Sequence, residues 1–455
     1  MNETKTLAEF AASISFDDLP PETVEKAKHC ILDFVANVYG SLQIGAVQKI
    51  IAYIRTLNGP PTATVLGAGF ATGLHQAAFL NGTAGEALEA QDGLRFGGNH
   101  PGVAVIPAAL ALAEQLNLDG KRLLEAVVIG YEVAGRIAAS IHPQHTLSGF
   151  LPTGTCGAFG AAAAAAKLLG YNADLMLNSL GNAGYLAPLS MAEHLMGGFT
   201  AKIVQGGQAA DAGLLAAGLA GAEVTGAPYV LEGSHLNGGF TQITTGNTRN
   251  LGVITTGLGE SFSINDIYFK PYTACRHTHG SAQASLALVA EESFACEDIE
   301  SINVKTYMIA GIAVGKGVDE NSSFVGAQFS IPYVVAACLL DGDMGPAQFR
   351  RKRLADPKIL ALANKVNVQP DAELSEMYPA FTASRVEIKL RGGQTIKRQI
   401  DTPKGDPRDP MTFEDLRAKL LRFAPPEKRD RANGIAAATL DLDACDDLKT
   451  LIQMI

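Results

Sequence analysis

Apolar and polar residues follow one another with a helical period along most of the first half of the chain. The run LPPE at residues 19–22 marks the start of an amphipathic helix, because proline is tolerated in a first helical turn. Gly or Pro stands at the ends of the further alanine-rich helices that we predict, at residues 107–116, 121–140, 158–169 and 211–219. Small side chains let helices approach one another closely, so this pattern predicts a compact all-α domain.

The pattern changes after residue 260. Residues 301–308 and 384–391 alternate at period two and are rich in strand-forming residues, and RGGQ at 391–394 is typical of a turn between strands. Helical patterns lie between the strands at 281–292 and 329–340, and they return at 413–421 and 440–455. We therefore predict a mainly α fold, in which a smaller α+β domain is inserted into a large all-α domain.

The predicted boundaries follow from these changes. Residues 1–262 together with 405–455 form the all-α domain, and residues 263–404 form the α+β domain. The run TPKGDPRDP at residues 402–410 is the return linker, because its prolines and glycine interrupt both helix and strand.

Composition narrows the class of protein. With 455 residues, 47% hydrophobic and 18% charged, the chain is typical of a folded protein with a large core. Its net charge of -10 argues against general nucleic-acid binding, which needs a basic face. The six cysteines are scattered without zinc-ligand spacing, which indicates reduced thiols. With no signal region and no long apolar run, we expect a cytoplasmic protein that binds no membrane, metal or other cofactor.

The densest polar stretch is EALEAQDGLRFGGNHPG at residues 86–102, between two alanine-rich helical patterns. It holds Glu89, Asp92, Arg95 and His100, which we predict to lie on a loop between helix ends. Such loops often carry ligand-binding groups, although a solvated surface loop fits these residues equally well.

Two other segments gather candidate groups. Lys202 stands at the head of a small, apolar helix, where it either binds a carboxylate or is merely solvated. The run FKPYTACRHTH at residues 269–279 lies where the domain character changes, and ligand sites favour such junctions. It contributes Lys270, Cys275, Arg276, His277 and His279. At residues 328–333, ordinary helix capping by Ser330 explains much of the polar pattern.

Taken together, these segments resemble one family in their order and spacing along nearly the whole chain. The sequence is similar to the MmgE/PrpD family. No single motif is specific to that family, but the whole series in this order is. The matching stretches are residues 31–34, 63–67, 81–84, 100–102, 130–137, 153–157, 201–202, 269–272, 278–279, 328–333 and 384–388.

The resemblance implies a homodimer without a cofactor and a site between the two domains. It also implies that His100, Lys202, Lys270, Cys275 and Tyr333 stand where the family places substrate-binding and acid/base groups. The chemistry common to the family removes a proton from carbon next to a carboxylate, which indicates a small anionic di- or tricarboxylate as substrate.

Two departures from the family pattern bear on the reaction. Members commonly carry Asp-x-x-Asp-Thr where this chain has EAQDG at residues 89–93, and a histidine where this chain has Leu151. Dehydration needs a proton donor and polar groups that hold the leaving oxygen. Their loss favours epimerisation of an iminodisuccinate-like substrate, with a 2-methylcitrate dehydratase-type lyase or a decarboxylase as the alternative. A helical binding or scaffold protein with a decayed site is the non-enzymatic alternative.

The expected roles follow from that chemistry. His100 is the first choice as base, because an imidazole titrates near neutral pH, and Tyr333, Cys275 or His277 returns the proton from the opposite face. The cationic groups bind the substrate and stabilise the charge that develops on its carboxylate. The expected substrate-binding set is Glu89, Asp92, Arg95, Lys270, Arg276, His277 and His279.

Overall fold

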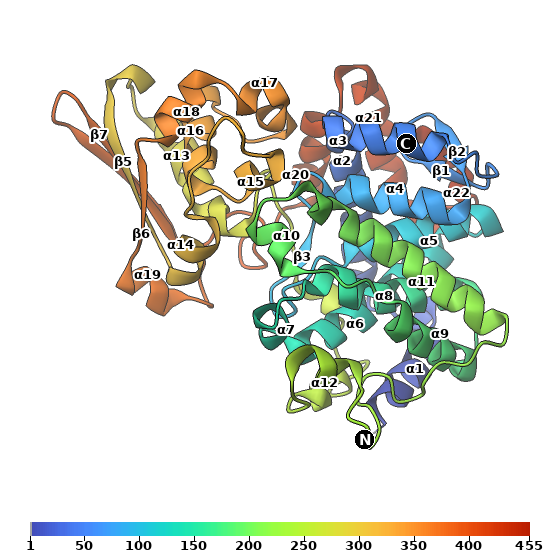
Figure 1. Ribbon diagram of the computed structural model, residues 1–455. Helices are drawn as coiled ribbons and strands as arrows, with labels where there is room; N and C mark the ends of the chain where they lie inside the picture. The colour runs from blue at the N-terminus through green and yellow to red at the C-terminus, as the bar shows by residue number, and fades with distance from the viewer. Residues whose placement is uncertain (1) are drawn as a thin grey trace.

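The computed structural model describes residues 2–455 and confirms the predicted mainly α fold, with 60% helix and 9% strand (Figure 1). In the first half, the helices are α1 (Glu3–Ser13), α2 (Pro21–Ser41), α3 (Gly45–Arg55), α4 (Leu74–Glu86), α5 (Gly102–Leu116), α6 (Gly120–Ile141), α7 (Gln144–Leu147), α8 (Pro152–Leu168), α9 (Ala173–Leu186), α10 (Ala192–Met196), α11 (Gln205–Gly221) and α12 (Phe240–Thr245). The later helices are α13 (His279–Glu291), α14 (Met308–Val314), α15 (Phe324–Gln328), α16 (Ile331–Asp341), α17 (Arg351–Leu354), α18 (Pro357–Ala363), α19 (Ala372–Met377), α20 (Phe413–Phe423), α21 (Arg429–Leu440) and α22 (Leu448–Met454).

The larger part of the molecule is a bundle of closely packed helices. α8 contacts α5, α6, α9 and α11, and α11 also lies against α4. The C-terminal helices return to this part, since α20 packs on α2 and α22 on α5, which Figure 1 shows as red helices beside blue ones. Both chain ends therefore contribute to the bundle, and we propose residues 263 and 404 as the limits of the inserted part.

The smaller part is built on a four-stranded sheet in the order β6 (Val366–Pro370), β5 (Ile299–Thr306), β7 (Ser384–Leu390), β8 (Thr395–Ile400). β5 pairs with β6 in parallel and with β7 antiparallel, and β7 pairs antiparallel with β8. Ile302, Val304, Val386 and Ile388 are buried in a second hydrophobic core, while alternate residues face outward, as the period-two pattern predicts. Helices α13 and α16 lie between the sheet and the bundle in Figure 1.

Four short strands complete the fold: β1 (Ala63–Val65), β2 (Phe70–Thr72), β3 (Gly93–Leu94) and β4 (Ile267–Tyr268). β1 and β2 form a hairpin. The pairing of β3 with β4 positions the site, because β3 lies in the polar loop between α4 and α5, and β4 leads directly into residues 269–279. The two segments that the sequence singled out as polar clusters are thereby held side by side.

Several predicted elements are confirmed and some boundaries are wrong. α2 begins at Pro21, and Ser330 caps α16 by accepting a hydrogen bond from the Tyr333 amide. Helices α8 and α11 begin about six residues before their predicted starts, because their first turns contain glycines that the periodicity does not reveal. Residues 440–455 are not one helix: α21 ends at Leu440, and Asp447 caps a separate helix, α22. Strand β6 was not predicted.

The length and hydropathy of the helices bear on whether any of them could span a membrane. Within residues 2–455, no single helix is long and apolar enough to cross one. α2 and α3 pass by length and composition only when taken together, and the chain bends by 92° between them.

Close helix packing at Gly207 gives a first prediction. A Cβ atom on Gly207 of α11 would lie 2.1 Å from the Phe79 carbonyl oxygen of α4, whereas nothing lies within 4 Å of one on Gly218 of the same helix. Gly207→Ala should therefore lower the free energy of unfolding by about 1–3 kcal/mol or more, because the helices must separate. Gly218→Ala should raise it by about 0.5–1 kcal/mol, because alanine favours the helix.

Thermal and urea unfolding of both variants checks this prediction. Gly218→Ala is the matched control, since it makes the same chemical change in the same helix. Equal stability of the two variants would contradict the close approach of α4 and α11.

Candidate functional site

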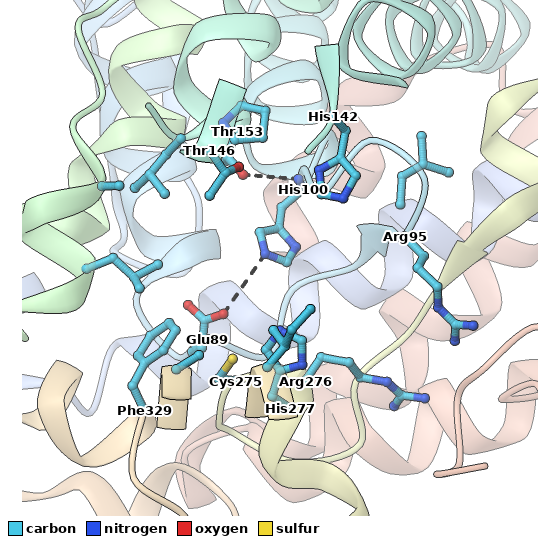
Figure 2. A pocket seen from close by; sticks show the side chains of 18 of the residues that line it. Glu89, Arg95, His100, His142, Thr146, Thr153, Cys275, Arg276, His277 and Phe329 are labelled. Carbon is cyan, nitrogen blue, oxygen red and sulfur yellow. Dashed lines mark hydrogen bonds and ion pairs between the residues drawn. The ribbon is translucent and has the colours of Figure 1, made fainter. Parts of the chain in front are cut away.

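A cavity of about 320 Å³ lies between the helical bundle and the smaller part of the molecule (Figure 2). Both parts contribute to its wall. Its polar lining consists of Glu89, Arg95, His100, His142, Thr146, Thr153, Lys202, Gln205, Tyr268, Lys270, Cys275, Arg276, His277, Tyr378 and Thr382. Its apolar lining includes Leu94, Leu151, Pro152, Ala192, Leu195, Met196, Ile309, Ala313 and Phe329. This mixture, a largely apolar wall with a few converging polar groups, is typical of a small-molecule site.

The carboxylate of Glu89 forms ion pairs with two buried lysines. Its Oε2 atom is paired with Lys202, and its Oε1 atom lies 2.9 Å from the Nζ atom of Lys270. Burial opposes ionisation of Glu89, but the charges of Lys202 and Lys270 outweigh it and hold its pKa below the usual value. Glu89 therefore stays ionised, and it fixes both ammonium groups at the edge of the cavity.

A second carboxylate lies behind this group. Glu86, the last residue of α4, is 3.1 Å from Lys202 and accepts hydrogen bonds from the side chain of Gln205 and the amide of Gly206. Burial weakens the charge of Lys202, yet the attraction of Glu89 and Glu86 raises its pKa above the usual value. Lys202 is thus a permanent cation that is held by two carboxylates.

The polar loop is buried, so the alternative of a solvated surface loop is wrong. Glu86 is 1% exposed and Glu89 3% exposed. Glu89 also has a φ of 52°, in the left-handed region that costs a non-glycine residue energy. That backbone turns its carbonyl oxygen to Lys270, which donates to it at 3.1 Å. The lysine thus binds both the carbonyl and the carboxylate of one residue.

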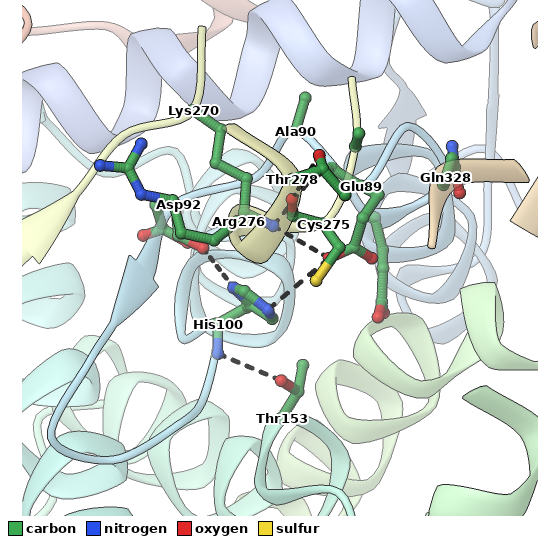
Figure 3. Close-up of polar contacts among 12 residues, drawn as sticks. Glu89, Ala90, Asp92, His100, Thr153, Lys270, Cys275, Arg276, Thr278 and Gln328 are labelled. Carbon is green, nitrogen blue, oxygen red and sulfur yellow. Dashed lines mark hydrogen bonds and ion pairs between the residues drawn. The ribbon is translucent and has the colours of Figure 1, made fainter. Parts of the chain in front are cut away.

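His100 is held with one ring nitrogen directed toward the ion pair (Figure 3). Its Nδ1 atom lies 2.5 Å from the Asp92 carbonyl oxygen and must donate to it, so Nε2 carries the lone pair. Nε2 is 4.0 Å from Glu89 Oε1, and the His100 amide donates to Thr153 Oγ1 at 3.1 Å. Burial, then the charge of Lys270, lowers the pKa of His100 to about 3. The imidazole is therefore neutral, with an unprotonated lone pair at Nε2.

The opposite wall of the cavity comes from the segment after β4. Figure 2 shows Cys275, Arg276 and His277 on one side and His100 with Thr153 on the other. Burial raises the pKa of the Cys275 thiol to about 11, so the thiol keeps its proton. Burial, then the charges of Lys270 and Arg276, lowers the pKa of His277 to about 4, and its Nδ1 atom contacts the Tyr307 hydroxyl at 2.5 Å.

Arg276 differs from the other cations of the site, because no carboxylate in residues 2–455 forms an ion pair with it. Its Nη1 and Nη2 atoms donate to the carbonyl oxygens of Lys404 and Pro403, each at 2.8 Å. Its Nε atom is buried and has no hydrogen-bond partner among residues 2–455. A buried guanidinium with unused bonding capacity is suited to a ligand carboxylate.

Most of the predicted site residues come together at this cavity, as Glu89, Arg95, His100, Lys202, Lys270, Cys275, Arg276 and His277 all line it. Arg95 is at its edge, paired with Asp406. Three predicted residues lie outside the lining: Asp92, His279 and Tyr333.

The three residues outside the lining are engaged elsewhere. The carboxylate of Asp92 accepts from the Tyr131 hydroxyl at 2.6 Å, while His279 Nε2 contacts the Ala274 carbonyl oxygen at 3.0 Å. The Tyr333 hydroxyl donates to the Gln348 carbonyl oxygen. Each side chain is buried behind the site, and we do not assign it a direct contact with substrate.

The sequence did not single out several groups at the cavity, among them Glu86, Tyr268 and His142. Glu86 lies in the polar stretch, but its contact with Lys202 is a tertiary one that the sequence does not reveal. Tyr268 reaches the cavity through the β3–β4 pairing, and His142 reaches it directly after α6. Within residues 2–455, no three His, Cys, Asp or Glu side chains are grouped as ligands of one metal ion.

Comparison with known proteins agrees with this arrangement. The chain is 28% identical to a cis-aconitate decarboxylase of Aspergillus terreus over 99% of its length and 95% of the relative. It is 27% identical to the human cis-aconitate decarboxylase over 99% and 94% of the two chains. A 2-methylcitrate dehydratase of Cupriavidus necator is 27% identical over 37% of each chain. These relatives are named as lyases, which supports an enzyme.

Two domain families match the chain and confirm the resemblance drawn from the sequence. The MmgE/PrpD N-terminal domain matches residues 5–251, which include Glu89, His100 and Lys202. The MmgE/PrpD C-terminal domain matches residues 272–442, which include Cys275 and Arg276. Together they span both walls of the cavity, and the chain belongs to the MmgE/PrpD family.

Proposed function

We propose that this protein removes and returns a proton at carbon next to a carboxylate of a small di- or tricarboxylate, with epimerisation of an iminodisuccinate-like substrate as the net reaction. The observation that carries the proposal is the pair of groups on opposite walls of the cavity. His100 is a neutral base and Cys275 is a protonated acid. Inversion at carbon needs a base on one face and an acid on the other.

The proposed reaction begins with substrate held by the cations of the site. Arg276, which lines the cavity, supplies the positive charge that attracts one carboxylate, and Lys270 stabilises the charge that develops on the carboxylate next to the reacting carbon. The Nε2 atom of His100 takes the proton, and the electron pair of the C–H bond moves into the carboxylate. The thiol of Cys275 then gives its proton to the other face of the carbon, and the thiolate and imidazolium exchange roles in the reverse direction.

The apolar wall supports the same chemistry. Leu151, Leu195 and Phe329 give the cavity an apolar wall, beside which charges interact more strongly than they do in bulk solvent. Leu151 stands where family members commonly have histidine, and it offers no proton to a leaving hydroxyl group. An epimerisation needs no such donor.

Decarboxylation of a cis-aconitate-like tricarboxylate is the second candidate. Its support is the similarity to cis-aconitate decarboxylases over 99% of this chain. That reaction also needs a proton delivered to carbon, so His100 and Cys275 would serve it as well. The two candidates differ in products, not in the groups that transfer protons.

Proton exchange in deuterium oxide distinguishes the candidates. With one stereoisomer of iminodisuccinate, we expect the other stereoisomer to appear with deuterium at the inverted carbon, followed by proton NMR. His100→Gln should reduce this rate by about 100-fold or more, since general base catalysis contributes about that much. His75→Gln is the control, because His75 is half exposed and pairs with Asp211. Carbon dioxide or an alkene formed from cis-aconitate or 2-methylcitrate, without exchange of iminodisuccinate, would replace the epimerase with a lyase.

The pH dependence of the reaction follows from the two proton-transfer groups. His100 must be neutral, and it loses this form only as pH falls toward about 3; Cys275 must be protonated, and it loses its proton only as pH rises toward about 11. We therefore expect kcat/KM for exchange to be flat between pH 5 and 9. A slope centred near pH 7 would contradict this assignment.

Such a slope has one specific source to test. Burial raises the pKa of Asp92 to about 7, and Asp92 holds His100 through its carbonyl oxygen. If kcat/KM for exchange does not depend on pH in the unmodified protein, it should not depend on pH in the variant Asp92→Asn either. If it abolished a slope found in the unmodified protein, Asp92 would control the base.

We also propose that the chain forms a homodimer through an apolar surface between α9 and the helical turn at residues 200–204. Tyr185, Leu189 and Phe199 are 92%, 69% and 63% exposed, and Met191 and Met196 are also exposed there. Large apolar patches of this kind mark protein contacts. Tyr185→Glu should convert a dimer into a monomer in light scattering, with Tyr53→Glu, on another exposed tyrosine, as the control. A wild-type chain that is monomeric at micromolar concentration would refute the proposal.

A further inference from the structure

In the strand pair that joins the two polar segments, a tyrosine lies opposite a glycine. Gly93 of β3 and Tyr268 of β4 are direct partners in the antiparallel pair. A Cβ atom on Gly93 would lie 2.4 Å from both the Cζ and the hydroxyl oxygen of Tyr268, and 2.9 Å from His100 Nδ1. The phenol therefore occupies the space of a side chain at position 93. It also lies beside the imidazole of the expected base.

The other contacts of Tyr268 place the residue at the wall of the cavity. Tyr268 lines the cavity, and its ring stacks with the guanidinium of Arg276 at 5.2 Å. Its hydroxyl has no hydrogen-bond partner within residues 2–455, although a phenol that is only 9% exposed ordinarily finds one. Burial raises the pKa of Tyr268 above its usual value, so the hydroxyl keeps its proton. The structure thus presents an unused donor between His100 and Arg276.

We propose that Tyr268 is a further catalytic residue, whose hydroxyl donates a hydrogen bond to the substrate carboxylate next to the reacting carbon. This inference rests on the proposed proton transfer. When His100 takes the proton, the electron pair of the broken C–H bond forms a carbon–carbon double bond to the carboxylate carbon. A second negative charge then develops on the carboxylate oxygens, and it returns to carbon when Cys275 gives its proton.

A donor aimed at that oxygen stabilises the charged intermediate more than the substrate, and this difference is what accelerates a reaction. The O–H bond of Tyr268 does not break. Tyr268 and Lys270 act on the carboxylate on which charge develops, while Arg276, which lies over the phenol ring, anchors the other carboxylate.

The variant Tyr268→Phe tests the role. It removes the unused hydroxyl and keeps the ring on Gly93 and Arg276, so the melting temperature should not change. We expect kcat for deuterium exchange to fall by about 100-fold, as happens when one donor to a developing oxyanion is removed. The Kd of malonate, measured by calorimetry, should change by less than about threefold, because uniform binding is not the role proposed. Tyr53→Phe, on the exposed surface and outside the proposed dimer contact, is the matched control.

Each outcome has one meaning. Exchange at the wild-type rate in Tyr268→Phe overturns the inference and leaves the proposed function standing. An equal loss of malonate binding and of exchange also overturns it, since the residue would then serve binding alone. No exchange by the wild-type protein refutes the proposed function itself, and malonate binding then shows whether the site takes dicarboxylates.

A second pair of variants tests the space between the strands. Gly93→Ala should lower the melting temperature, because its Cβ meets the phenol and the imidazole. Adding Tyr268→Ala should restore the melting temperature but not the exchange rate, because the space is free and the donor is gone. Recovery of exchange in this double variant would overturn the role of the phenol.

Discussion

The whole site depends on one buried carboxylate held between two lysines that come from different parts of the chain. Lys202 follows α10 in the helical bundle, and Lys270 follows β4 at the entry to the smaller part; both bind Glu89. Removing such charges from water is costly, and a buried cluster is stable only when every charge has partners of good geometry. Here Glu86, Gln205 and the Glu89 carbonyl complete the set. Loss of either lysine would leave an uncompensated charge, so the ion pairs fix the two walls of the cavity relative to each other.

The fold converts this constraint into geometry for proton transfer. The loop that carries Glu89 continues through β3 to His100, and the strand pair β3–β4 places Lys270 and Cys275 on the other side. His100 gains its tautomer from a backbone carbonyl, which does not titrate, so the lone pair stays at Nε2 wherever the ring is neutral. The site needs little rearrangement when substrate enters, because the base is already neutral, the acid is already protonated and the lysines are already paired.

The sequence predicted the fold class and most of the residues of the site because their signals are local or depend on order along the chain. Helical periodicity reveals α6, period-two alternation reveals β5 and β7, and the two polar clusters are dense enough to be noticed. Tertiary contacts are not visible in this way. Tyr268 reaches the cavity only through its pairing with Gly93, and Tyr333 was expected there although its hydroxyl is directed to Gln348. In both cases the direction of one side chain decides whether the residue lines the cavity, and packing between distant segments sets that direction.

The balance of charges limits what the cavity can hold. Two lysines face two carboxyl groups: Glu89 stays ionised, whereas burial raises the pKa of Glu86, so the positive charge of the lysines is largely compensated in this part of the site. Arg276 adds a positive charge that no carboxylate among residues 2–455 pairs with. One substrate carboxylate is therefore neutralised by the charge of Arg276. The second carboxylate accepts hydrogen bonds from Lys270 and Tyr268, close to the His100 imidazole. This asymmetry suits a substrate whose two carboxylates play different roles, one as an anchor and one as the group on which charge develops.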